Sequence, residues 1–198
     1  MPTLLIATSN PGKMREITSL LAGLPFDLTT PDALGLRLEV EETAHTYRGN
    51  AALKAAAYAL SSGLPTLADD SGLEVAPLNG LPGIRSARFA PFPNATDAER
   101  RAYLLENLAP HPRPWRAQFV CVACLALPGG EKRYTRGVLP GEIIPEERGS
   151  NGFGYDPIFY LPERGCTLAE LPEDEKNRIS HRGRALEAMR AILEETLK

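Results

Sequence analysis

Polar segments that directly follow apolar runs hold the residue types best suited to chemistry. The first of these segments contains Thr8, Ser9, Asn10, Pro11, Gly12 and Lys13. Where a strand ends and a helix begins, unpaired backbone N–H groups and the helix dipole attract phosphate, and a lysine adds a full charge. The segment therefore predicts a phosphate site. It does not match the GxxxxGKS/T phosphate loop, and Asn-Pro-Gly is also a common turn, so an ordinary turn is the alternative.

Two adjacent carboxylates follow a second apolar run. Asp69 and Asp70 come directly after Leu67 and Ala68 and are followed by Ser71. An acid at a strand end near a phosphate site can hold Mg²⁺ or orient a water for attack on phosphorus. If the chain is still extended there, the two carboxylates point to opposite faces, so only one enters the site. An ordinary turn is again the alternative, because Asp and Ser beside glycine favour turns.

An acidic segment precedes a helix that carries a polar stripe. Glu41 and Glu42 come shortly before Tyr47, Asn50 and Lys54, whose spacing of three and four aligns them on one helix face. Asn50 and Lys54 could reach phosphate oxygens while a glutamate completes a Mg²⁺ shell, since Mg²⁺ needs only one or two carboxylates. The alternative is a solvated helix face.

Two further segments near the carboxyl end combine glycines, an aromatic residue and cations. In the first, glycines flank Phe153 and let the backbone approach a flat ligand, while the ring offers a stacking face to a nucleobase, worth ~1 to 3 kcal/mol. In the second, Lys176, His181 and Arg182 can donate hydrogen bonds to phosphates and purine keto oxygens. A core aromatic and ordinary surface cations are the alternatives.

Apolar periodicity predicts the elements that position these segments. We expect strands at residues 3–7, 26–30 and 66–68, a hairpin of strands at 118–127 and 132–143, and helices after the first polar segment, at 46–61, at 96–108 and at 182–198. Residues 73–84 read as an irregular excursion, and Pro110, Pro112 and Pro114 as a stiff connection that could be a lobe boundary. Early alternation of strands and helices followed by a hairpin predicts a mixed α/β fold around a partly antiparallel sheet.

Composition limits the classes of partner. The chain has 198 residues and a formal net charge of -3, which argues against a protein that holds nucleic-acid polymers by a basic face. It offers no hydrophobic stretch long enough for a signal peptide or a membrane span, so we expect a cytoplasmic protein that does not bind membranes. The three cysteines are expected as thiols, and Cys121 and Cys124 as core residues that point to opposite faces of a strand.

In this order and spacing the motifs resemble the inosine triphosphate pyrophosphatase family, also called Ham1-like or non-standard purine nucleotide pyrophosphatases. The resemblance is nearly full length and runs through TSNPGK, EET, NALKA, ADDSGLEV, PGIRSAR, GFGYDPIF and EKNRISHRG. Ordered motifs of this kind are far more specific than any one alone.

The resemblance implies an elongated two-lobed α/β fold, with residues 1–198 as a single domain and the active site in the cleft between the lobes. It also implies Mg²⁺ dependence and a homodimer. The implied reaction converts a nucleoside triphosphate and water into the monophosphate and pyrophosphate. The implied substrates are ITP, dITP and XTP, whose removal cleanses the nucleotide pool.

The resemblance further implies residue roles. Asp70 would be the general base and a metal-site carboxylate, and Glu41 the better match for the second metal-site acid, with Glu42 its near neighbour. Substrate contacts would come from the remaining motif residues: Thr8, Ser9, Asn10, Pro11, Gly12, Lys13, Asn50, Lys54, Ser71, Phe153, Gly154, Tyr155, Asp156, Lys176, His181 and Arg182.

Two residues depart from the family pattern, and two rival classes remain. Gly49 stands where an acid is common, and Arg85 where an aromatic residue is common. The nearest enzyme rival is the Maf-like nucleotide pyrophosphatase group, which GFGYDPIF and the SHR segment disfavour. A nucleotide sensor without turnover is the rival from another class, and it would have no need of a poised acid at Asp70.

Overall fold

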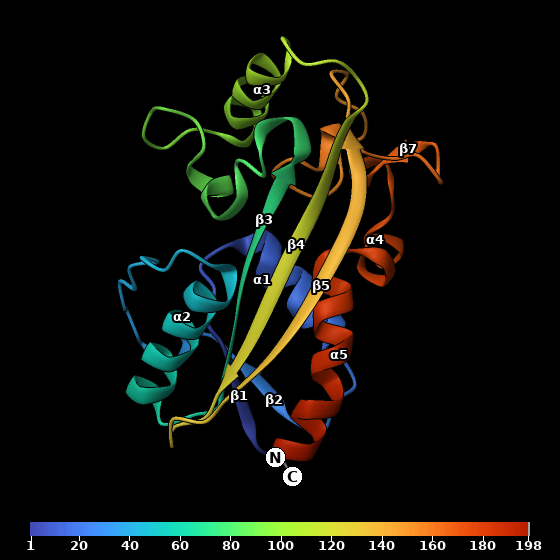
Figure 1. Ribbon diagram of the computed structural model, residues 1–198. Coiled ribbons are helices and arrows are strands. Elements are labelled where there is room, and N and C mark those ends of the chain that lie inside the picture. Colours follow the sequence, from blue (N-terminus) through green and yellow to red (C-terminus); the bar gives the residue numbers. More distant parts are fainter. Residues whose placement is uncertain (198) are drawn as a thin grey trace. The chain divides into compact units, whose positions relative to one another are not determined.

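The structure is a computed structural model that describes residues 1–197 (Figure 1). Its strands are β1 (Thr3–Ile6), β2 (Asp27–Thr29), β3 (Thr66–Val75), β4 (Trp115–Ala126), β5 (Lys132–Ile143), β6 (Phe159–Leu161) and β7 (Cys166–Thr167). Its α-helices are α1 (Pro11–Leu20), α2 (Tyr47–Ser62), α3 (Asp97–Leu108), α4 (Glu173–Ile179) and α5 (His181–Thr196). None of these described helices combines the length and the apolar character needed to cross a membrane.

All seven strands form one sheet in the order β2-β1-β3-β4-β5-β6-β7. β1 pairs in parallel with β2 and with β3, whereas β6 pairs antiparallel with β5 and with β7. The predicted mixed, partly antiparallel sheet flanked by helices is therefore confirmed.

The described chain divides into two compact units. The first contains residues 1–70, residues 121–137 and the segment from Arg182 onward, and the second contains residues 71–120 and 138–181. The divisions fall inside β3, β4 and β5. The proline-rich connection at 110–114 lies within the second unit, so its interpretation as a lobe boundary was wrong. That the chain acts as one domain stays a prediction.

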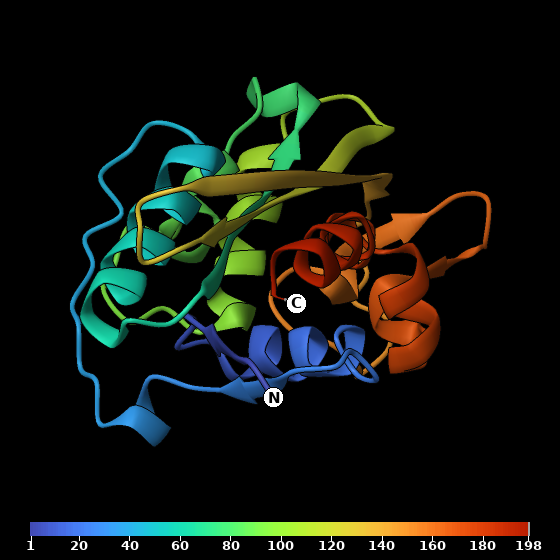
Figure 2. The same cartoon turned by 90° about the horizontal axis from the view of Figure 1, so that it is seen from below.

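In the first unit, the strands are covered on both faces. Buried side chains of β1, β3 and β4 pack against α1 and α5 in one cluster, and alternate residues pack against the alanine face of α2 in another. Figure 2 shows α2 apart from α1 and α5. Cys121 belongs to the first cluster and Cys124 to the second, because successive strand side chains alternate between faces. The prediction of two buried cysteines on opposite faces is confirmed.

The second unit has a core of its own. It gathers Leu73 and Val75 from β3, Phe119 from β4 and Leu104 and Leu108 from α3, together with aromatic and aliphatic residues that follow β5. Thr96 caps α3 with a capping box, in which its hydroxyl accepts from the backbone N–H of Glu99.

Several elements differ from the sequence prediction, and two of them, the short strands β6 and β7, were not predicted at all. β3 does not end at Ala68 but continues to Val75, because Leu73 and Val75 have a core to enter and Ser86 accepts a hydrogen bond from the Leu73 backbone N–H. The irregular excursion begins only after Val75. α4 was not predicted, since seven mostly charged residues carry little apolar periodicity. β4 begins three residues earlier than expected, at Trp115 instead of Gln118.

Candidate phosphate and acid site

The predicted phosphate loop is built by a strand that hands over directly to a helix. Asn10 caps α1 by accepting a hydrogen bond from the Lys13 backbone N–H at 3.0 Å, and Pro11 opens the first turn. These are the residue types that such positions favour. Thr8 Oγ1 accepts from the Asn10 backbone N–H at 3.2 Å. Lys13 therefore leaves the first turn of α1 at the positive end of the helix.

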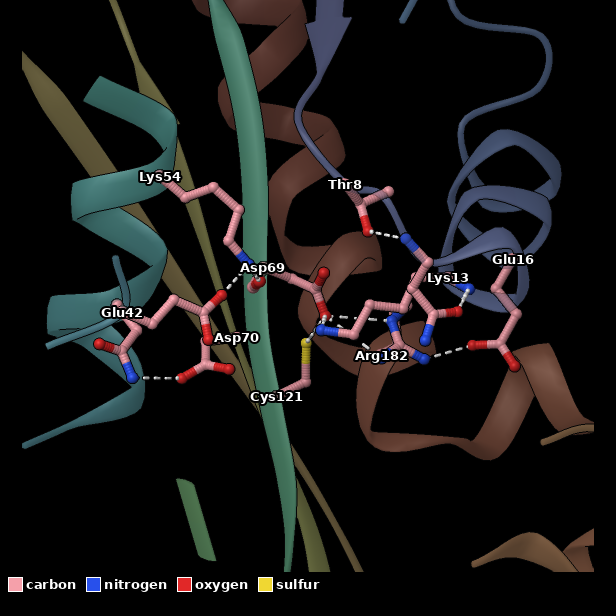
Figure 3. Close-up of polar contacts among 11 residues, drawn as sticks. Thr8, Lys13, Glu16, Glu42, Lys54, Asp69, Asp70, Cys121 and Arg182 are labelled. Carbon is pink, nitrogen blue, oxygen red and sulfur yellow. Dashed lines mark hydrogen bonds and ion pairs between the residues drawn. The ribbon is translucent and has the colours of Figure 1, made fainter. Parts of the chain in front are cut away.

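Asp69 and Asp70 point to opposite sides of β3, as an extended chain requires (Figure 3). Asp69 lies 3.1 Å from the Lys13 ammonium and 3.2 Å from the Arg182 guanidinium. Asp70 instead accepts a hydrogen bond from Asn50 Nδ2 at 3.0 Å. Two neighbouring acids thus serve different partners.

Asp69 is a buried carboxylate surrounded by cationic side chains. Its side chain is only 1% exposed. Burial alone would raise its pKa, but Lys13, Arg182 and Lys54 outweigh burial and hold the pKa of Asp69 far below its usual range. Arg182 also pairs with Glu16. Burial would lower the pKa of this guanidinium, but Asp69 and Glu16 outweigh burial and raise it. Asp69 is therefore a fixed counter-ion that holds Lys13.

Asp70 has the opposite electrostatic character. Burial raises the pKa of its carboxyl group, and the negative charge of Glu42 raises it further, although Lys13 and Asn50 act in the other direction. A raised pKa gives this carboxylate a greater affinity for a proton than an ordinary aspartate has. Asp70 is suited to accept a proton from a reacting water.

Lys54 and Glu42 form an ion pair next to these acids. The Lys54 ammonium lies 2.6 Å from Glu42 Oε1 and donates to the Asp69 backbone oxygen at 3.1 Å. Burial would lower the pKa of Lys54, but Asp69 and Glu42 raise it, so the lysine stays charged. Glu41, in contrast, is exposed. The structure thus brings Glu42, not Glu41, to the ion pair beside Asp70.

Asn50 links the acidic segment to Asp70. Its Nδ2 donates to Asp70, while its Oδ1 accepts from the Ala44 backbone N–H at 3.0 Å. This fully buried amide is a connection within the protein in addition to any contact with a ligand. The neighbouring Gly49 is explained by space, because a Cβ there would overlap the side chain of Ala44.

The described residues offer a magnesium ion only a small number of carboxylate ligands. They contain no group of three or more His, Cys, Asp or Glu side chains arranged for a metal. Mg²⁺ keeps several waters and needs one or two protein carboxylates together with substrate phosphates. Asp70 and the nearby charge of Glu42 fit that demand, because burial and the charge of Glu42 raise the pKa of Asp70, and a cation would oppose both effects.

A cavity of about 550 Å³ borders the amino-terminal part of the predicted phosphate loop within the first unit. Its volume lies in the range of small-molecule sites. It is lined by Thr8, Ser9, Asn10, Pro11, Met14, Thr30, Pro31, Asp32, Leu36, Arg37, Leu38, Glu39 and Tyr58.

The glycine-flanked segment lies in the second unit and is held at several points. The Gly154 backbone N–H donates to Asp97 at 2.7 Å, and its carbonyl accepts from Arg101 at 2.8 Å. Tyr155 donates its hydroxyl hydrogen to the Ser86 carbonyl, and burial raises the pKa of this phenol. The backbone around Phe153 is therefore fixed.

The three predicted cationic or donor groups near the carboxyl end are all buried. In the second unit, Lys176 pairs with Asp156 at 2.5 Å, and the ring of His181 stacks on Phe119 with centroids 4.7 Å apart. In the first unit, Arg182 pairs with Asp69. Ser71, the first residue of the second unit, is half-buried, and Arg85 is exposed.

The sequence did not predict several residues that hold the site residues in place. Glu16 carried a signal, since it follows Lys13 by three positions and so shares its helix face. Asp97, Arg101 and Ser86 gave no local signal, because their partners lie far away in the sequence.

A strand-to-helix loop with a lysine in its first turn, beside a buried pair of acids, is the arrangement expected of an α/β protein that handles a phosphorylated ligand. The chain belongs to the Ham1 family, whose sequence model matches residues 4–192. It is 51% identical over 187 residues to a dITP/XTP pyrophosphatase of Deinococcus deserti, covering 94% of this chain and 87% of that protein. It is 50% identical over 188 residues to a dITP/XTP pyrophosphatase of Geobacter sulfurreducens, covering 94% of each.

Solved structures show the same fold. A HAM1 protein from Coxiella burnetii superposes with a TM-score of 0.90 at 44% identity, covering 99% of this chain and 100% of that one. The Staphylococcus aureus Ham1 protein superposes with a TM-score of 0.86 at 40% identity, covering 98% of each chain.

Proposed function

We propose that this protein hydrolyses non-standard purine nucleoside triphosphates, namely ITP, dITP and XTP, to the monophosphate and pyrophosphate. The similarity to proteins named dITP/XTP pyrophosphatase supports the substrate class. The observation that carries the chemistry is Asp70, a buried carboxylate of raised pKa that Asn50 holds in place. A protein that only bound nucleotides would have no use for such a base.

In this proposal the residues of the first unit act on the phosphates. The loop at the start of α1 binds the triphosphate through Thr8, Ser9, Asn10, Pro11, Gly12 and Lys13. Lys13 and Lys54 neutralise its charge, which lowers the barrier to attack by water. Asp70 orients the water and takes its proton as the water oxygen bonds to the α-phosphorus. The bond to the bridging oxygen breaks, and pyrophosphate leaves with that oxygen.

Magnesium is part of the proposal. Asp70 would hold it together with a neighbouring glutamate, and when bound the metal would lower the pKa of water and neutralise phosphate charge. Glu41 is the sequence match for this second acid. The ion pair of Glu42 with Lys54 and the effect of Glu42 on Asp70 support Glu42 instead.

Residues of the second unit would recognise the base and sugar. Direct contact with the substrate is assigned to Ser71, Phe153 and Gly154. Tyr155 and Asp156 complete the wall of the site for the base and the sugar. Lys176 and His181 supply donors, and so does Arg182 of the first unit. A donor that faces the 6-keto group of hypoxanthine or xanthine would face the 6-amino group of adenine, which is also a donor. The donor would then be left unpaired, and an unpaired buried polar group costs ~1 to 3 kcal/mol. Guanine shares that keto group, so its exclusion depends on the 2-position.

The proposal also covers the setting in which the protein works. We place it in the cytoplasm as a homodimer, acting on small-molecule triphosphates and not on nucleic-acid polymers. The net charge of -3 supports the last point.

The test is pyrophosphate release from ITP, XTP, GTP and ATP with Mg²⁺, in the wild type and in Asp70→Asn. We expect preferential cleavage of ITP and XTP and a loss of at least about 100-fold in the variant, as for removal of a general base. Asp174→Asn, an exposed acid on α4, is the matched control and should keep full activity. Nucleotide binding without turnover in the wild type would instead identify a sensor.

A further inference from the structure

The segment that leads into α2 carries Glu41 and Glu42 but forms no regular structure. Residues 36–44 belong to no helix or strand of the described chain. We call these residues the acidic segment. It runs alongside α2 (Figure 2). An irregular segment keeps one conformation only where other elements hold it, because ordering each residue costs conformational entropy. The position of its acids therefore depends on contacts with the rest of the first unit.

One face of α2 supplies such contacts at the carboxyl end of the acidic segment. Asn50 and Lys54 are four positions apart and share this face. Asn50 Oδ1 accepts a hydrogen bond from the Ala44 backbone N–H at 3.0 Å. The Lys54 ammonium lies 2.6 Å from Glu42 Oε1 (Figure 3). The helix thus holds the acidic segment at residues 42 and 44.

Tyr58 continues the same face by one turn and holds the acidic segment nearer its amino end. It follows Lys54 by four positions. Its hydroxyl donates to the Leu38 backbone oxygen at 3.2 Å, and its half-buried ring packs against the cluster that contains the alanine face of α2. Because packing fixes the ring, the hydroxyl holds residue 38 close to the helix. Glu42 therefore lies between two points of attachment.

The cavity beside the predicted phosphate loop brings this attachment next to the site. Its lining includes Thr8, Ser9 and Asn10 of the loop, and also Leu38 and Tyr58. The acidic segment and the loop therefore share one cavity wall. Movement of residue 38 would change that wall together with the position of the acids that follow it in the chain.

We propose that Tyr58 is a positioning residue, which holds the acidic segment so that Glu42 is pre-organised beside Asp70 for the proposed magnesium site. This inference rests on the proposed function, because it takes Mg²⁺ as the ion that the acids hold. Without the hydroxyl, binding of the ion would also have to order the acidic segment, and the affinity for Mg²⁺ would fall. Tyr58 itself touches neither the metal nor the substrate.

The first experiment compares two tyrosine variants. Tyr58→Phe removes the hydroxyl and keeps the ring. Tyr134→Phe is the matched control, because this ring packs against the same cluster while its hydroxyl bonds to Cys124. We expect Tyr58→Phe to raise the Mg²⁺ concentration for half-maximal pyrophosphate release from ITP about 3- to 10-fold, as for loss of one hydrogen bond. The kcat at saturating Mg²⁺ should stay nearly unchanged, and Tyr134→Phe should change neither value.

A double-mutant cycle with Glu42→Gln tests whether Tyr58 acts through that acid. If it does, Tyr58→Phe causes no further rise in the Mg²⁺ requirement once the carboxylate is gone. Additive effects of the two substitutions would overturn the proposal, because the hydroxyl would then act by another route. An unchanged Mg²⁺ requirement in Tyr58→Phe would overturn it as well.

A second readout needs neither metal nor substrate. Hydrogen exchange of the Ala44 backbone N–H reports how often the acidic segment leaves α2, because this group bonds to Asn50. We expect exchange about 3- to 10-fold faster in Tyr58→Phe, as for loss of one hydrogen bond, and unchanged in Tyr134→Phe. The amino acid 4-aminophenylalanine in place of Tyr58 keeps a donor on the ring and should restore the rate of the wild type.

The outcomes separate this inference from the proposed function. Unchanged exchange in Tyr58→Phe refutes the positioning role even if the protein cleaves ITP. Faster exchange in a protein that releases no pyrophosphate from ITP with Mg²⁺ refutes the proposed function, while the attachment of the acidic segment by Tyr58 stands.

Discussion

Asp69 and Asp70 are adjacent in the sequence but differ in proton affinity, because β3 turns one toward three cations and the other toward Asn50 and Glu42. In Asp69 the attraction of the cations outweighs burial, and the carboxyl group stays ionised. In Asp70 burial dominates, and the carboxyl group gains affinity for a proton. One carboxylate can therefore hold Lys13 while its neighbour is available for the proposed role of base.

The depressed pKa of Asp69 makes the free energy of unfolding depend on pH. Its pKa is lower in the folded protein than the ~3.9 of an unfolded chain, so its contribution is complete above that value and is lost as the pH falls below it. We expect Asp69→Asn to lower the free energy of unfolding by about 3 kcal/mol at pH 7, because it leaves Arg182 and Lys13 without their shared anion. The difference from the wild type should shrink between about pH 5 and pH 2.

Urea unfolding across this pH range measures the effect. Asp174→Asn, which removes one exposed carboxylate of the Asp174–Arg178 pair, is the control and should unfold like the wild type within about 0.5 kcal/mol. If the free energies of unfolding of Asp69→Asn and the wild type changed in parallel with pH, Asp69 would not be the group with the depressed pKa.

Two matched variants test which acid would complete the proposed metal site with Asp70. Glu42 pairs with Lys54 and acts on Asp70, whereas Glu41 is exposed, so we expect Glu42→Gln to raise the Mg²⁺ concentration for half-maximal activity about 10-fold or more. Glu41→Gln removes the same charge one position away and should have little effect. A titration of pyrophosphate release against Mg²⁺ measures both, and the reverse order would assign the role to Glu41.

At the scale of the element, β3 shows why an Asp-Asp-Ser-Gly sequence need not form a turn. Gly72 does not supply a left-handed conformation. It supplies space, since a Cβ there would overlap the Gly83 carbonyl and the Ser86 hydroxyl, which lie against the strand. The strand can therefore continue past the two acids, and its extended backbone is what sends Asp69 and Asp70 to opposite sides.

We expect Gly72→Ala to lower the free energy of unfolding by about 1 to 3 kcal/mol, the usual effect of overpacking a tight contact. Gly129→Ala is the matched control, because a Cβ at that position meets no atom within 4 Å. Thermal or urea unfolding of the two variants gives the comparison. Equal stabilities would mean that the contact between Gly72 and Gly83 yields without strain.

At the scale of the whole molecule, local patterns in the sequence predicted the elements, but not the long-range contacts. The helices expected at 46–61 and 96–108 and the placement of the two cysteines followed from periodicity. The ion pairs around Asp69 could not be predicted in this way, because Lys13 and Arg182 are separated by most of the chain. The preference for Glu42 over Glu41 stays a prediction, and it too rests on contacts that the fold makes, since Glu42 pairs with Lys54 and acts on Asp70.

The cysteines provide a prediction for the folded molecule as a whole. Cys121 and Cys124 are buried on opposite faces of β4, and burial raises the pKa of Cys124 to about 11 and that of Cys121 still further. The thiolate is the reactive form, so neither should react with a thiol reagent until the first unit opens. Cys166 is only partly buried and should react in the native protein. We expect one thiol to be labelled in native buffer and three in denaturant, with Cys166→Ser removing the native reaction. Rapid native labelling of Cys121 or Cys124 would mean that one face of β4 opens without global unfolding.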